Sequence, residues 1–367
     1  MTNGSKHFFR RNPQFTLVWA GQLLSQSGQR MFQMAAIWWL LEHVTEGPGR
    51  FVGAFMVLAA LPSLLGVRWI GFTVDRVSTQ KLLVLCDLTA GVLLCSIGVA
   101  LKFDLFSVGE LLLCGFAAAV LQAHIDPALN KALNQVTEPK DLESAVGYLT
   151  STQSIANFGG ACLGAAVIGA VGVAHTCMLA AVGYVLSSMF TALARFHSVQ
   201  EDAASSSPGV AGWSLLHDFP LVKRVLIGFA LVNFFATPTL VVLPLYVKSV
   251  LLAGARELGI LESGLWLGML TGAWIATRVH FLKTRMGLAA LTVFVFGLCL
   301  SFPAWATWML GYWVALFIGS LGLGILNAKM VSYFQEVIPQ DMKGRFFALL
   351  QAAIGATFPI AYFSFGL

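Results

Sequence analysis

The chain has 367 residues, of which 57% are hydrophobic and only 11% are charged, and its mean hydropathy is +0.79. This composition excludes an ordinary soluble globular domain and indicates a membrane protein. The formal net charge of +5 does not indicate a nucleic-acid partner, because the basic residues are distributed among turns on one side of the predicted spans.

Repeated apolar runs of about 20 residues predict membrane-spanning helices, since such a run crosses a hydrocarbon core of roughly 30 Å at 1.5 Å per residue. Backbone groups find no water there, and long unbroken apolar runs favour helices over the short alternating strands of a barrel. The sequence therefore predicts an all-α membrane protein with about eleven transmembrane helices. Their approximate cores are residues 15–41, 51–74, 82–101, 106–128, 144–170, 173–195, 221–247, 259–279, 287–304, 308–332 and 345–367.

A basic segment, MTNGSKHFFRRNPQF, precedes the first span. It lacks the short apolar core and the small-residue cleavage site of a signal peptide, so we expect the first span to be retained. Arg10 and Arg11 are interpreted as a basic anchor before this span rather than as a twin-arginine signal.

The distribution of lysine and arginine predicts the orientation of the spans. With the N-terminus inside, fifteen of these residues fall on the inner side: Lys6, Arg10, Arg11, Arg76, Lys81, Lys131, Lys140, Arg195, Lys223, Arg224, Arg278, Lys283, Arg285, Lys343 and Arg345. Four fall on the outer side: Arg50, Lys102, Lys248 and Arg256. Because cytoplasmic loops carry the excess of positive charge, we expect a multi-pass protein with a cytoplasmic N-terminus.

The first span carries a polar face. Gln22, Gln26, Gln29 and Gln33 recur at spacings of four, three and four, which is the periodicity of one helical face. Arg30 adjoins them, and a cation in the middle of a span costs roughly 2.5–3.5 kcal/mol, so it is expected to face a partner or water. The face is either part of a polar transport path or a seam of hydrogen bonds that joins helices.

The turn after the second span has the sequence GFTVDRVSTQK at residues 71–81. Gly71 would allow close approach of a neighbouring helix, and Asp75 with Arg76 at the boundary could latch two helix ends in one conformation and release them in another. Taken alone, the residues favour the simpler interpretation, in which Asp75, Arg76 and Lys81 form a solvated turn.

Polar side chains recur within the fourth, seventh and tenth spans: Gln122, His124, Asp126 and Asn130; Asn233, Thr237 and Thr239; Asn327 and Lys329. Asp126 is the first candidate for proton coupling, because desolvation raises the pKa of a carboxyl toward the range in which it exchanges protons. It could instead pair with Lys131. Glu262 in the eighth span and Asp87 in the third are alternative coupling residues, and each could equally be a structural ion-pair member.

Two groups of glycines predict close helix packing. Gly160 and Gly164 lie four residues apart in the fifth span, and Gly319, Gly322 and Gly324 are clustered in the tenth. Such residues let helix backbones approach closely in a membrane.

A polar connection at residues 196–220 divides the chain into a six-span bundle at residues 1–195 and a second bundle at residues 221–367. The two halves repeat weakly at an offset of 200 residues, in the turn that enters the fifth span of each half. The identical pairs are Pro139 with Pro339, Asp141 with Asp341, Leu149 with Leu349, Ala156 with Ala356 and Phe158 with Phe358. The counterpart of the span at 173–195 would lie beyond Leu367, so the predicted architecture is six plus five, with helix 12 absent.

Several segments resemble a known family. The pattern of Gly71, Asp75, Arg76 and Lys81 is similar to the Gly-x-x-x-Asp-Arg motif between helices 2 and 3 of the major facilitator superfamily, although VSTQK replaces its usual denser basic run. Residues 19–42, DPALN at 126–130 and GRFFALL at 344–350 resemble the drug-exporter branch typified by bacterial macrolide efflux proteins. The resemblance covers essentially the whole chain. It implies a two-bundle fold in which helices 1, 4, 7 and 10 line a central cavity, and it favours the gating role of the turn.

No enzyme is predicted, because the sequence has no metal-ligand spacing, nucleophile elbow or phosphate loop. Its six cysteines lie in apolar runs without metal or redox pairing. We expect no cofactor and no metal, and any energy must come from an ion or substrate gradient.

The resulting hypothesis is a monomeric secondary transporter, an efflux antiporter that exports amphipathic small molecules by alternating access in exchange for protons. Its partners would be the substrate, protons and membrane lipids. The expected substrate-binding residues are Gln22, Gln26, Gln29, Arg30, Gln33, Asn233 and Asn327; the proton-coupling residues are Asp126 and Glu262; the gating residues are Gly71, Asp75, Arg76 and Lys81. The competing hypotheses are a lysolipid or siderophore transporter of the same fold, or a non-transporting, degenerate member.

Overall fold

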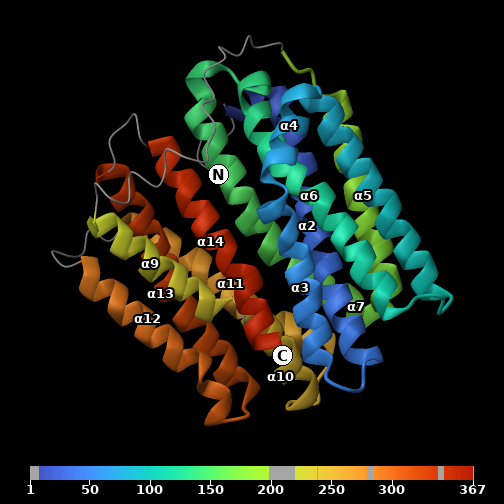
Figure 1. Cartoon of the computed structure of the whole chain (residues 1–367), viewed down its shortest axis with the longest axis vertical. Coiled ribbons are helices and arrows are strands. Elements are labelled where there is room, and N and C mark those ends of the chain that lie inside the picture. Colours follow the sequence, from blue (N-terminus) through green and yellow to red (C-terminus); the bar gives the residue numbers. More distant parts are fainter. Residues whose placement is uncertain (1–7, 198–219, 238, 279–284, 338–342, 367) are drawn as a thin grey trace. The chain divides into compact units, whose positions relative to one another are not determined.

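A computed structural model describes residues 8–197, 220–237, 239–278, 285–337 and 343–366. Every regular element in these ranges is a helix, as predicted, and no strand occurs among them (Figure 1). The chain divides into two compact units, residues 1–203 and residues 204–367, hereafter unit 1 and unit 2. The predicted linker at 196–220 falls largely outside the described residues, as do Pro339 and Asp341 of the predicted repeat.

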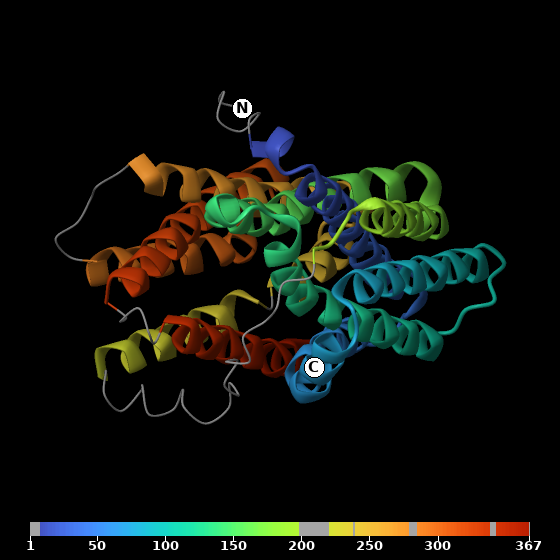
Figure 2. The same ribbon diagram turned by 90° about the horizontal axis from the view of Figure 1, so that it is seen from above.

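Unit 1 is a helical bundle in which the first helix packs along the last. Its elements are α2 (Pro13–His43), α3 (Pro48–Leu65), α4 (Val67–Arg76), α5 (Thr79–Lys102), α6 (Val108–Val136), a 3-10 turn at Pro139–Asp141, and α7 (Leu142–Leu193). Helix α7 packs against both α2 and α5, while α6 packs against α3 and α5 (Figure 2). The side-chain oxygens of Asp141 accept hydrogen bonds from Arg11 at 3.2 Å and from Asn12 at 2.9 Å, which fixes the start of α7 to the start of α2.

The helices of unit 1 contain two breaks that bear on the predicted spans. The span predicted at 51–74 is divided at Gly66 into α3 and α4. Pro62 lies inside α3, where its ring removes one backbone hydrogen bond, and the helix ends three residues later at Leu65. The predicted fifth and sixth spans are two helices that follow one another directly within α7 and are separated at Gly172, whose φ of 84° and ψ of 174° are not helical and favour glycine.

Glycines set the close contacts in unit 1. A Cβ atom added at Gly28 would lie 2.9 Å from the carbonyl oxygen of Ala180, and one added at Gly160 would lie 2.8 Å from that of Ser27. A Cβ at Gly164 would lie 3.3 Å from the Cα atom of Met31. The predicted packing role of Gly160 and Gly164 is therefore confirmed, and their partner is α2.

Unit 2 contains α9 (Pro220–Ala236), α10 (Thr239–Ser249), α11 (Ala255–Arg278), α12 (Arg285–Leu300), a 3-10 turn at Phe302–Ala304, α13 (Met309–Val337) and α14 (Lys343–Gly366). Helix α13 packs against α11 and α12, and α14 packs against α9. A Cβ at Gly319 of α13 would lie 2.9 Å from that of Cys299 in α12, which confirms the close packing predicted for the glycines of the tenth span.

Seven stretches of the described helices are long and apolar enough to cross a membrane: Pro48–Leu65, Thr79–Lys102, Val108–Val136, Phe158–Leu193, Leu226–Ser249, Ala255–Ala276 and Met309–Met330. Residues 290–304 form a shorter apolar helix. Many large apolar side chains on these helices, such as Val92, Leu113 and Phe294, are exposed, as lipid-facing residues would be. The chain is thus a multi-pass helical protein, while the count of eleven spans stays a prediction.

Candidate functional site

Unit 1 contains a polar cavity of about 300 Å³. It is lined by residues of α2, α3, α6 and α7: Gln26, Gln29, Arg30, Gln33, Ala59, Ser63, Ala119, Gln122, Ala123, Asp126 and Ala156. The helical spacing predicted that the glutamines of the first span share one face, and that face is the wall of this cavity. The charged lining residues are one arginine and one aspartate, and most of the other polar ones are amides, so the cavity has little net charge.

Arg30 is held between α7 and the cavity. Its side chain is 5% exposed, and its Nη1 donates a hydrogen bond to Gln33 Oε1 at 3.3 Å. A Cβ atom at Gly160 would lie 2.7 Å from the Cβ of Arg30, so only glycine leaves room for the arginine stem against α7. The guanidinium therefore reaches the cavity from a fixed position.

Tyr184 of α7 positions two of the cavity glutamines. It is buried, and its hydroxyl lies 2.7 Å from Gln29 Oε1 and 3.4 Å from Gln122 Oε1. Tyr184 was not predicted from the sequence as a site residue. The signal for it was a single tyrosine in the middle of an otherwise apolar span, where a buried hydroxyl needs a hydrogen-bond partner.

Asp126 lines the cavity with an exposed side chain. It makes no hydrogen bond or ion pair with any described residue. The alternative pairing with Lys131 is not formed, because the Lys131 amine donates instead to the backbone carbonyl of Val74 at 3.3 Å, near the end of α4. A carboxyl that is accessible from the cavity and unpaired within its unit is suited to exchanging protons.

Gln22, which was expected to contact substrate, does not line the cavity. It is fully buried on the side of α2 that faces α5, and its Nε2 lies 3.4 Å from Oδ2 of Asp87. Gln22 therefore belongs to a seam of hydrogen bonds that joins helices. The position of Gln26, Gln29, Arg30 and Gln33 in the cavity wall fits a polar transport path.

The turn at residues 71–81 is solvated within unit 1. Asp75, Arg76 and Lys81 are exposed, and the Arg76 guanidinium lies over the ring of Phe72 at 3.9 Å from the ring centroid. A Cβ at Gly71 would meet nothing within 4 Å, so the close approach expected at this glycine does not occur. The gating role of this turn stays a prediction.

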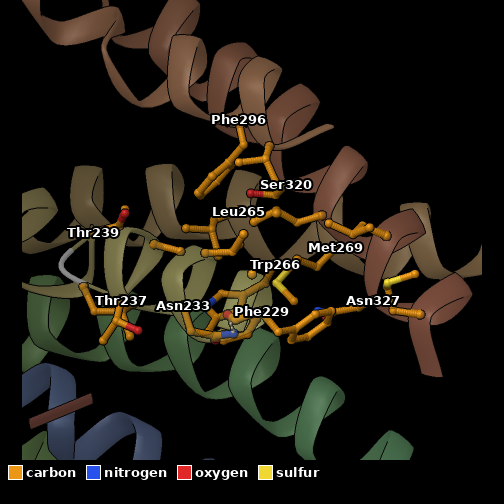
Figure 3. A pocket seen from close by; sticks show the side chains of 18 of the residues that line it. Phe229, Asn233, Thr237, Thr239, Leu265, Trp266, Met269, Phe296, Ser320 and Asn327 are labelled. Atoms are coloured by element: carbon orange, nitrogen blue, oxygen red, sulfur yellow. Dashed lines mark hydrogen bonds between the residues drawn. The ribbon is translucent and has the colours of Figure 1, made fainter. Parts of the chain in front are cut away.

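Unit 2 contains a larger and more apolar cavity of about 460 Å³ (Figure 3). Phe229, Leu265, Met269 and Phe296 contribute apolar surface from three helices. The predicted binding residues Asn233 and Asn327 both line it. Asn233 Nδ2 donates to the carbonyl of Phe229 at 2.9 Å, so part of its hydrogen-bonding capacity is used within its own helix. Glu262, a predicted coupling residue, is buried on α11 but does not line the cavity.

Comparison of the two units explains why this second cavity is wide. In unit 1 a Cβ at Gly21 of α2 or at Gly91 of α5 would meet the end of α7 at 3.1 Å and 3.0 Å. In unit 2 a Cβ at Gly228 of α9 or at Gly297 of α12 would meet nothing within 4 Å. Residues of both α9 and α12 line the cavity, and Gly228 is one of them, so the cavity is wide where these helix faces are not covered.

The sequence matches a model of the Major Facilitator Superfamily over residues 18–361. It is 23% identical over 357 residues to macrolide efflux protein A of Streptococcus pyogenes, an alignment that covers 94% of this chain and 87% of that protein.

Solved structures with a similar fold include two bacterial proteins. One is a bacterial homologue of the human lysosomal transporter Spinster in an inward-facing, unoccupied conformation, with a TM-score of 0.73 and 12% identity over 95% of this chain and 80% of that chain. The other is a bacterial homologue of the iron transporter ferroportin in an inward-facing state, with a TM-score of 0.70 and 15% identity over 97% and 91% of the two chains. At these identities the likeness concerns the fold.

Proposed function

Because the chain belongs to the Major Facilitator Superfamily and is a membrane transporter rather than an enzyme, we propose that it exports amphipathic small molecules by alternating access, driven by protons. The observation that carries this proposal is the polar cavity of unit 1, in which an arginine, an aspartate and four glutamines converge within a helical membrane bundle. Ionisable groups within membrane-spanning segments are costly in free energy, and they commonly mark a substrate or ion path.

The polar lining of the cavity in unit 1 and the apolar lining of the cavity in unit 2 together favour an amphipathic substrate. The amides of Gln26, Gln29 and Gln33 can donate and accept hydrogen bonds, and Arg30 supplies a cation. The apolar wall of the cavity in unit 2 can accommodate hydrophobic groups, with Asn233 and Asn327 as its polar contacts. The direction of transport is proposed from the similarity to macrolide efflux protein A.

Asp126 is the proposed coupling carboxyl of the cavity, because substrate and proton would then compete for one accessible and unpaired group. Glu262 is kept as the coupling candidate of unit 2, where its burial sets it apart from the surface acids. The turn with Gly71, Asp75, Arg76 and Lys81 is the proposed cytoplasmic gate, in a bacterial inner membrane with the N-terminus in the cytoplasm. The working unit is proposed to be a monomer without a cofactor.

A second candidate, lysolipid transport, is favoured by one observation. The cavity of unit 2 is apolar over most of its lining and is about half as large again as that of unit 1, which suits an acyl chain. Siderophore transport and a loss of transport are kept as further hypotheses, and the same experiment distinguishes them.

The test is an uptake panel with purified protein in proteoliposomes, using a cationic fluorescent dye, a macrolide, a siderophore and a lysolipid, with and without a pH gradient. We expect the dye and the macrolide to accumulate only with the gradient. Asp126→Asn should reduce their uptake to the level without a gradient, since no proton can be exchanged at that site. Uptake of the lysolipid or of the siderophore alone would select that hypothesis, and no uptake of any compound would contradict the proposal.

A further inference from the structure

A second buried carboxyl lies in unit 1, away from the polar cavity. Asp87 of α5, Gln22 of α2 and Ser187 of α7 meet at one point, and each of the three is 0% exposed. Ser187 Oγ donates to Asp87 Oδ2 at 2.6 Å, and Gln22 Nε2 lies 3.4 Å from the same oxygen. Three helices of the bundle are therefore joined by one polar cluster.

Two acceptor oxygens of this cluster receive no hydrogen bond from the part of the chain that the structure describes. Asp87 Oδ1 and Gln22 Oε1 are both buried and have no hydrogen-bond partner among the described residues, and both can only accept if the acid is ionised. No lysine, arginine or histidine among the described residues pairs with Asp87. A fully buried carboxylate without a cation is strongly disfavoured in an apolar bundle, and an orphaned acceptor beside it adds to the cost.

The titratable groups around Asp87 offer no compensating charge. On α7, one turn before Ser187, the Tyr184 hydroxyl bonds to Gln29. On α5, Cys86 is a neutral neighbour in sequence. On α2, Arg30 lies two turns further along and its guanidinium bonds to Gln33 at the cavity. On α6, His124 is bonded to the carbonyl of Val120 and lies against Trp69.

We propose that Asp87 is a proton-binding site that is occupied in this conformation. One added proton on Oδ1 removes both defects: the carboxylic hydrogen can donate to Gln22 Oε1, while Gln22 Nε2 keeps its contact with Oδ2. The carboxyl is neutral, Ser187 still donates to it, and no charge is buried. The reaction is the addition of a proton to a carboxylate, so no other reactant is needed.

The position of the site connects it to the cavity. Tyr184 and Ser187 lie on adjacent turns of α7, and Tyr184 reaches Gln29 and Gln122 at the cavity wall. Helix α2 contributes Gln22 to the proton site and Gln26 to the cavity one turn later. Loss of the proton would place a charge between α2, α5 and α7 and force water or a cation into their interface. The proton therefore stabilises the packing that shapes the cavity. Its release and rebinding during transport would couple the cavity to protons, and this coupling role of Asp87, unlike the site itself, rests on the proposed transport function.

The occupied site can be measured without transport. Infrared difference spectra of the purified protein, wild type against Asp87→Asn, should contain the carbonyl stretch of a protonated carboxylic acid that persists well above about pH 4, where an aspartate in water is ionised. Asp126→Asn is the control, because it removes the carboxyl of the polar cavity and leaves Asp87 in place. Identical wild-type and Asp87→Asn spectra in this region would overturn the proposal.

Thermal unfolding keeps the proposal testable through a second observable. The folded wild type holds a proton that the unfolded chain releases, so its melting temperature should fall as the pH rises above about 4, the ordinary pKa of an aspartate, and Asp87→Asn should flatten this dependence because an amide mimics the neutral acid. Ser187→Ala keeps the acid and removes one donor, and should keep the slope. An equal slope in wild type and Asp87→Asn would count against the occupied site.

Dye-driven proton release from proteoliposomes separates the two proposals. If Asp87→Asn removes the infrared band and also uncouples dye movement from proton movement, the coupling role is supported. If the band is lost while coupled transport is unchanged, the coupling role is overturned and the proposed function stands. If the wild type moves neither dye nor protons, the proposed function fails while the proton site is judged by its spectrum.

Discussion

Tyr184 shows how one side chain orders the polar cavity. The glutamine face of α2 was predicted because polar residues at a helical spacing stand out in an apolar span. Periodicity could not predict which of those amides would be fixed, since that depends on a hydroxyl more than 150 residues away on α7. Gln22 illustrates the same limit: it shares the spacing of Gln26 and Gln29 but turns toward Asp87.

The phenol of Tyr184 can be tested with a matched pair of substitutions. Tyr184→Phe removes the hydrogen bond to Gln29 without creating a cavity, and should lower the free energy of unfolding by about 1 kcal/mol, typical of one buried hydrogen bond. It should also weaken dye binding, because Gln29 and Gln122 lose their common anchor. Tyr246→Phe is the control, since the Tyr246 hydroxyl has no hydrogen-bond partner.

Chemical denaturation and dye titration of the two variants would measure both effects. The interpretation of Tyr184 would be wrong if Tyr184→Phe behaved like Tyr246→Phe in stability and in dye affinity.

At the scale of helices, small residues decide which faces are covered. The break of the second span at Gly66 was missed, although Pro62 in the same run was a signal for it. The boundary between the fifth and sixth spans was placed correctly beside Gly172, because a glycine between two apolar runs permits the left-handed backbone that separates the two helices there. Packing partners such as Ser27 for Gly160 depend on tertiary contacts and were not predictable.

Helix α5 of unit 1 and helix α12 of unit 2, the third predicted span of each half, provide a comparison of covered and open faces. Gly98 of α5 lies against α7, where a Cβ would be 2.8 Å from the carbonyl oxygen of Ala174, whereas Gly297 of α12 has nothing within 4 Å. Gly98→Leu should therefore destabilise the protein by about 1–3 kcal/mol or more through overpacking, while Gly297→Leu should be tolerated.

Melting temperatures of the two leucine variants in detergent would test this difference. Equal losses of melting temperature would show that α12 is as closely covered as α5, and would contradict the open surface found at Gly297.

On the scale of the whole molecule, the fold class and the family could be predicted from the sequence, because both depend on long apolar runs and short motifs. The two separate cavities could not, because they arise from how each bundle closes. In unit 1, α7 packs against α2 and the cavity gathers polar side chains of α2 and α6, whereas in unit 2 Gly228 of α9 and Gly297 of α12 are uncovered and the cavity is mostly apolar.

The central claim is that the polar cavity of unit 1 opens to each side of the membrane in turn. The direct measurement is the reaction of Gln26→Cys, in a variant without the six native cysteines, with a membrane-impermeant maleimide in right-side-out and inverted vesicles. Val92→Cys, on the exposed apolar face of α5, is the lipid-facing control.

We predict that Gln26→Cys is labelled from both sides, that a pH gradient changes the ratio of the two rates, and that the dye protects the cysteine. Val92→Cys should stay unlabelled in both kinds of vesicle. Labelling of Gln26→Cys from one side only, with or without the gradient and the dye, would contradict alternating access.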